Sequence, residues 1–169
     1  MGFTWSSPSG SLGQSLIDGE QPFIFRGGDL VITRADELAI VMHHSLWSHV
    51  AVVVTVGTKV LAFGDGHFQP LSLYLTHRPN SFVRRLECQR PSGFDAKLFA
   101  SAQKASDKLL QRTKMNQDAR EGYSAFHVLS IMRLTESEYE PKSLRPYHFS
   151  SETPFKRIEL PDYGPNEAI

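Results

Sequence analysis

The stretch WSHVAVVV, residues 47–54, is the part of this chain that most strongly predicts its fold. Its β-branched residues are typical of a buried strand, and the run continues to Val56. A turn at Gly57 follows, and residues 59–63 are predicted to return as the second strand of a hairpin. The sequence therefore places a histidine, His49, near the start of the strongest strand in the chain.

Short strands and two helices are predicted on either side of this hairpin. The strands cover residues 30–33 and 82–86, each of which is short and apolar. A long helix is predicted over residues 94–112, because apolar residues recur there at spacings of three and four. A second helix is predicted over residues 123–134. Short strands followed by helices favour an α+β fold with an antiparallel sheet.

The 169 residues are most simply divided into one domain and two flanking segments. Residues 1–22 are rich in serine and glycine and are expected to form a flexible arm. Residues 23–160 are expected to form the domain, with a last strand near residues 155–160. Residues 161–169 are expected to be a C-terminal tail.

The composition excludes several classes of function. Basic and acidic residues number 18 each, which argues against a broad basic surface for nucleic acid. No stretch resembles a membrane-spanning helix or a secretory signal. The one cysteine, Cys88, permits no intramolecular disulfide and no paired-cysteine zinc motif. We therefore expect no metal or cofactor, and favour a cytoplasmic or virion-associated protein over a secreted one.

A second stretch, GYSAFH at residues 122–127, belongs with the histidine strand. A thiol nucleophile is activated by a helix N-terminus and by a nearby histidine that accepts its proton. A histidine on a central strand that faces the start of a helix meets both demands. His49 and the helix predicted to begin at Tyr123 are candidates for this arrangement.

Several segments in the same order resemble the circularly permuted papain-like family. This family includes NlpC-type peptidases of the YiiX kind, related poxvirus virion proteins and lecithin:retinol acyltransferase. The resemblance spans roughly residues 27–134, and it is carried by GDLV (28–31), SHVAVV (48–53), KVL (59–61), PL (70–71), FVRRL (82–86) and GYSA (122–125). It implies a permuted papain-like fold, with a small antiparallel sheet or partial barrel packed against two or three helices.

The resemblance also implies roles for individual residues. His49 matches the general base, and Ala125 occupies the position of the nucleophilic cysteine. The third polar residue of the family has no match in the strand at residues 60–63, so Asp65, just beyond it, is a candidate for that place. Trp47, Tyr123 and Ser124 are candidates for contact with the substrate.

Two functions remain open at this point. One is a cysteine-dependent amide or ester hydrolase or acyltransferase, acting on a peptide, glycopeptide or lipid acyl substrate, with an engineered alanine at residue 125. The other is a catalytically inactive binding protein that keeps the cleft, with a natural alanine, as in a viral or effector accessory protein. Alanine at 125 fits both, and a misplaced alignment or a purely structural α+β domain would also explain it. The absence of a polar residue at Ala62 favours the second function.

Overall fold

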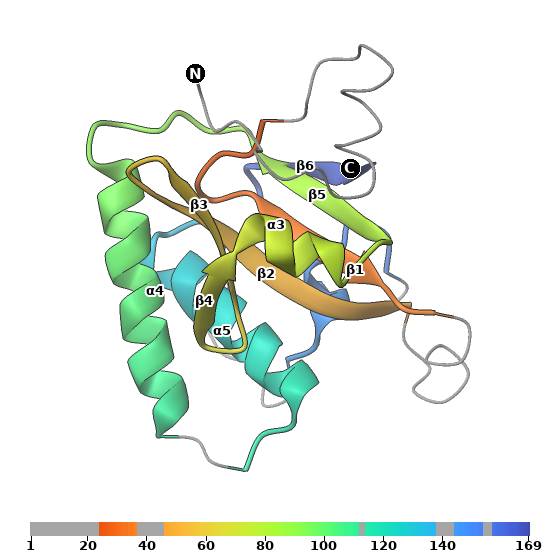
Figure 1. The fold of residues 1–169 in the computed structure, drawn as a ribbon. Coiled ribbons are helices and arrows are strands. Elements are labelled where there is room, and N and C mark those ends of the chain that lie inside the picture. The colour runs from red at the N-terminus through yellow and green to blue at the C-terminus, as the bar shows by residue number, and fades with distance from the viewer. Residues whose placement is uncertain (1–23, 37–45, 112–113, 138–143, 154–156) are drawn as a thin grey trace.

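The computed structural model describes residues 24–36, 46–111, 114–137, 144–153 and 157–169 (Figure 1). Within these residues, six strands form one open sheet in the order β4-β3-β2-β1-β5-β6, and every neighbouring pair is antiparallel. The predicted α+β class with an antiparallel sheet is therefore confirmed. The elements are β1 (Leu30–Arg34), β2 (Trp47–Val56), β3 (Lys59–Gly64), β4 (His67–Pro70), α3 (Leu71–Thr76), β5 (Ser81–Leu86), α4 (Phe94–Leu110), α5 (Gln117–Ile131), the 3₁₀ turn η1 (Pro146–Phe149) and β6 (Tyr163–Ala168).

Both faces of the sheet are covered. The short helix α3 lies across one face, and α4 and α5 pack on the other (Figure 1). In β2, Ala51 and Val53 join the cluster under α3, whereas Val50, Val52 and Val54 join the larger cluster under α4 and α5. A strand that is buried on both faces needs apolar side chains at every position, and this accounts for the unbroken run that begins at Val50.

The helix α5 begins earlier than the sequence predicted. Its first residue is Gln117, and the side chain of Asn116 caps it by accepting a hydrogen bond of 3.0 Å from the backbone N–H of Ala119. The prediction that the helix starts at Tyr123 is therefore wrong. Ala125 lies in the third turn, away from the free N–H groups and the positive end of the helix dipole.

The C-terminal segment differs from its prediction as well. Residues 161–169 were expected to form a tail, but Tyr163–Ala168 form the edge strand β6, paired with β5. The described part of the predicted strand at 155–160, residues 157–160, is not a strand. The arm expected at residues 1–22 lies outside the described residues.

A buried aspartate fixes the turn that precedes β1. The Asp29 carboxylate is fully buried and accepts hydrogen bonds from the backbone N–H groups of Arg26 (3.0 Å) and Leu86 (3.2 Å). It also forms ion pairs with Arg85 and Arg90. Desolvation raises the pKa of this carboxyl above its ordinary value, against the opposing effect of these donors and charges. Asp29 thus joins the start of β1 to the end of β5.

Candidate functional site

His49 is held near the start of β2, opposite Thr33 of β1. Its side chain is 26% exposed, so one part of the ring reaches solvent. The ring nitrogen Nδ1 lies 3.0 Å from Oε2 and 3.2 Å from Oε1 of Glu121, which projects from α5. The structure therefore pairs the predicted base with a carboxylate that the sequence analysis did not single out.

The Glu121 side chain is almost completely enclosed, with 2% of its surface exposed. Desolvation raises the pKa of this carboxyl above its ordinary value, since a charged carboxylate is costly to bury. The hydrogen bond and charge of His49, the charge of Arg78 and the backbone N–H of Val50 oppose this rise. Glu121 is thus a buried acid, and His49 is the residue that does most to stabilise its charged form.

This pairing determines what the imidazole can do chemically. When Nδ1–H donates to Glu121, the lone pair of the neutral ring lies on Nε2. Among the described residues, none forms a hydrogen bond with that nitrogen. A carboxylate that orients a histidine in this way is the usual support of a general base. The same geometry also offers Nε2 as a hydrogen-bonding group for a bound ligand.

Polar side chains between β1, β5 and α3 lie beside this pair. The hydroxyl oxygens of Thr33 and Ser81 are 2.9 Å apart, and Ser81 donates a 2.8 Å hydrogen bond to the carbonyl of Arg78. The Arg78 guanidinium stacks 3.9 Å above the ring of Tyr74. Tyr74 is buried, and desolvation together with the charge of Glu121 raises its hydroxyl pKa. These neighbours extend the polar environment of Glu121 beneath α3.

The position expected for the nucleophile is closed to solvent. Ala125 has no exposed surface and belongs to the apolar cluster that includes Val50, Val128 and Leu129. Glu121 and Ala125 are one turn apart, and so lie on the same side of α5. The helix residue that contacts His49 is therefore the one a turn before the predicted position.

The predicted substrate-contact residues are also interior. Trp47 is buried and packs edge-to-face on Phe82, with ring centroids 5.6 Å apart. Tyr123 is buried, with its ring 4.2 Å from that of His127. Ser124 is fully buried as well, and its hydroxyl has no hydrogen-bond partner in the described parts of the chain. Their proposed contact with a substrate stays a prediction.

Asp65 forms its ion pair with a residue other than His49. It lies in the turn after β3 with φ of 51°, and its carboxylate forms an ion pair with Arg120. The carboxylate that meets His49 is Glu121, the residue next to Arg120. A sequence signal for this existed in Asn116, since a helix capped there carries Glu121 and Ala125 on one side.

Cys88 lies far from His49 along the sheet. Thr33 pairs with both His49 and Ser81, so these three residues mark one end of the strands. Cys88 follows the opposite end of β5, seven residues beyond Ser81, a separation of roughly 20 Å for extended chain. The one thiol of the chain therefore cannot pair with His49.

Within residues 24–36, 46–111, 114–137, 144–153 and 157–169, no group of three or more His, Cys, Asp or Glu side chains is arranged to hold a metal ion. The helices of the same segments are too short or too polar to cross a bilayer.

Comparison with known proteins gives a distant structural likeness. No protein-family model matches the chain, and no curated protein matches it. Among solved structures, the chain is similar to the crystal structure of metalloprotein yiiX from Escherichia coli O157:H7, with 15% identity and a TM-score of 0.49. The match covers 82% of this chain and 94% of that chain. This likeness concerns the arrangement of the chain and assigns no role to any residue.

Proposed function

We propose that this chain is a non-catalytic protein of the permuted papain-like type, which binds a peptide, glycopeptide or lipid ligand and does not cleave it. The observation that carries the proposal is the contact between His49 and Glu121. Because this carboxylate engages Nδ1, a thiol enzyme would need a cysteine beside Nε2, where the base could reach the nucleophile directly. The one cysteine of the chain, Cys88, follows the opposite end of β5, so the imidazole is left to bind a ligand through Nε2.

The burial of residue 125 supports the same proposal. A cysteine side chain there would lie among apolar residues such as Val50 and Val128. Such surroundings raise the pKa of a thiol and keep it protonated. Replacing Ala125 by cysteine would therefore not restore a reactive nucleophile in this chain.

Two cysteine variants of a Cys88→Ser protein test the proposal. One carries Ala125→Cys and the other Glu121→Cys, and both are treated with iodoacetamide at mildly acidic pH. We expect the thiol at 121 to react faster than the thiol at 125, because it faces the partly exposed His49, whereas residue 125 is enclosed by apolar side chains. Adding His49→Gln should slow this reaction. The thiol at 125 should react slowly, with or without His49.

A Ser130→Cys protein supplies the reference rate for an exposed thiol on the same helix. Near-native unfolding temperatures establish that each variant is folded before its rate is compared. If the thiol at 125 reacts quickly and loses this reactivity with His49→Gln, the proposal is wrong. The hydrolase or acyltransferase with a nucleophile at residue 125 would then be the better description.

A further inference from the structure

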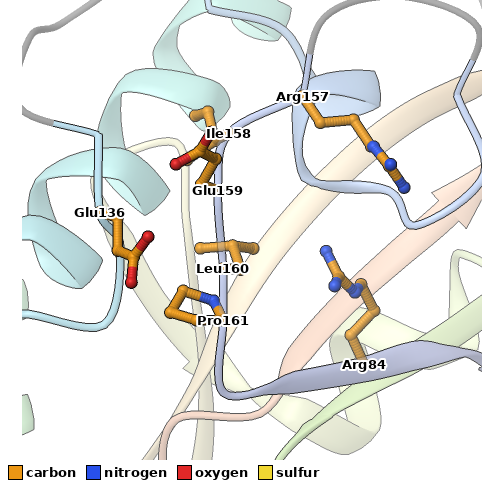
Figure 2. Close-up of a pocket in the computed structure, with 7 residues that line it drawn as sticks. All are labelled: Arg84, Glu136, Arg157, Ile158, Glu159, Leu160 and Pro161. Atoms are coloured by element: carbon orange, nitrogen blue, oxygen red, sulfur yellow. The ribbon is translucent and has the colours of Figure 1, made fainter.

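A pocket of about 480 Å³ lies on the side of the molecule where β5 meets the segment before β6 (Figure 2). In Figure 2 the side chains of Arg84 and Arg157 extend toward one another on one side of this pocket. Glu136 and Glu159 lie on the other side, with Leu160 and Pro161 between the two groups. The pocket is separate from the His49 site, and nothing in the proposed function uses it.

Arg84 is a buried cation with no acidic partner in the described residues. Only 8% of its surface is exposed. Its Nε donates to the carbonyl of Gly164 at 2.8 Å and its Nη1 to the carbonyl of Phe149 at 2.7 Å. Within the described segments no carboxylate lies within ion-pair distance of its guanidinium. Buried charges in proteins are usually paired with an opposite charge, so this cation is incompletely compensated.

The charge of Arg84 persists in the folded protein. Burial lowers the pKa of Arg84 to about 10, which still leaves the guanidinium protonated at neutral pH. Tyr163 favours the charged form, whereas the like charge of Arg157 opposes it. The fold therefore keeps two cations close enough to repel one another, and an anion between them would relieve that repulsion.

Donor groups remain available on both side chains. Nη2 of Arg84 forms no hydrogen bond with any described residue. Arg157 uses Nη1 to donate to the carbonyl of Ser151 at 2.7 Å, and its Nε and Nη2 form no such bond within the described residues. Guanidinium groups bind phosphate through pairs of parallel N–H donors. Two of them with unused donors form a suitable cradle for one such group.

The glutamates limit what the pocket can accept. Glu136 and Glu159 are exposed and line the wall opposite the two arginines. Their charges repel a ligand that carries negative groups along its whole length, such as a nucleic acid. A ligand with one compact anionic group avoids this repulsion by placing that group at the arginines.

We propose that this pocket binds the phosphate group of a small ligand, held between Arg84 and Arg157. A phosphate dianion matches the two cationic charges and presents oxygens to both side chains. The recognised group is the same in inorganic phosphate and in a phosphate monoester.

Titration of the full chain with sodium phosphate at slightly alkaline pH tests this assignment, with sodium chloride keeping the ionic strength constant. Backbone amide resonances of residues 157–160 should shift and saturate. In an Arg157→Ala protein the affinity should fall by at least about 10-fold, because charge-assisted hydrogen bonds are lost. Lys104→Ala is the matched control, since it removes an equal charge from the exposed side of α4. It should leave the affinity unchanged.

Two further measurements sharpen the assignment. Arg84→Lys keeps the buried charge but loses the forked donor geometry, and it should weaken phosphate binding. If that variant does not fold, Arg157→Ala carries the test alone. Titration with glycerol 3-phosphate distinguishes the sources: tighter binding than inorganic phosphate indicates an ester ligand, and equal binding indicates phosphate itself. Shifts that do not saturate, or equal affinity in Arg157→Ala and Lys104→Ala, would overturn the proposal.

Discussion

Glu121 and Arg84 are both charged side chains enclosed by the fold, but they are compensated in different ways. Glu121 has His49 directly beside it, at 3.0 Å. Arg84 has two backbone carbonyls, and its charged neighbour is another arginine. Carbonyl dipoles satisfy the hydrogen bonds of a cation, yet they do not neutralise it. A buried charge can therefore be compensated within the protein, as that of Glu121 is, or be left available to a counter-ion from outside, as that of Arg84 is.

The largest expected effect comes from removing Arg84. An Arg84→Ala protein loses hydrogen bonds that join β5 to both Gly164 and Phe149, and leaves those carbonyls without this donor. We expect the free energy of unfolding to fall by about 3 kcal/mol, as measured by urea denaturation.

Arg85→Ala is the matched control for that measurement. Arg85 is the next residue along β5 and is more exposed, and it pairs with Asp29 at 3.4 Å. Its removal should lower the free energy of unfolding by about 1 kcal/mol or less, because the buried Asp29 keeps Arg90 and two backbone N–H donors. Equal losses in the two variants would mean that Arg84 contributes no more to the fold than a surface arginine.

A double-mutant cycle measures how far Glu121 and His49 compensate one another. Glu121→Ala should lower the free energy of unfolding by about 1 to 2 kcal/mol, less than Arg84→Ala, because the partly exposed His49 can be hydrated again. The coupling energy between Glu121→Ala and His49→Ala should be about 1 kcal/mol. A coupling energy of zero would show that the pair contributes nothing to stability. Glu121 would then be no better compensated than Arg84.

The smallest expected effect is a dependence on pH. Because burial raises the pKa of Glu121, the folded protein holds this proton more tightly than the unfolded chain does. Its contribution to stability is therefore fully present below the ordinary pKa of 4.5, and is lost as the pH rises through the raised pKa. Relative to Glu121→Gln, the wild-type protein should lose stability across this range in urea denaturation. A relative gain with rising pH would show that its interaction with His49 outweighs its burial.

The parts of the fold that the sequence predicted are those with strong local patterns. The strand β2 follows from its unbroken apolar run, and α4 from the apolar stripe that begins at Phe94. The strand β6 lacked such a pattern, because its sequence YGPNEA includes residues that are rare in strands. It forms through pairing with β5 and lies at the edge of the sheet, where Pro165 is tolerated.

Only part of the candidate site could be predicted, because local sequence patterns mark some of its residues and not others. His49 follows from the apolar strand that contains it, but Glu121 precedes Tyr123, where the sequence predicts that α5 begins. The first turn of α5 is polar and gives no apolar spacing, so only the cap at Asn116 marked its beginning. Arg84 and Arg157 line one pocket although they are far apart in the chain, and no local pattern encodes that proximity.

The position of β6 has a consequence for synthesis of the protein. Until residues 163–168 have left the ribosome, β5 is an uncovered sheet edge. The hydrogen bond from Tyr163 to the carbonyl of Gly28, which spans 135 residues, likewise forms only after Tyr163 has been made. The nascent protein therefore carries an exposed edge while the segment between β5 and β6 is translated, and slow elongation over that segment would prolong the interval in which it can aggregate.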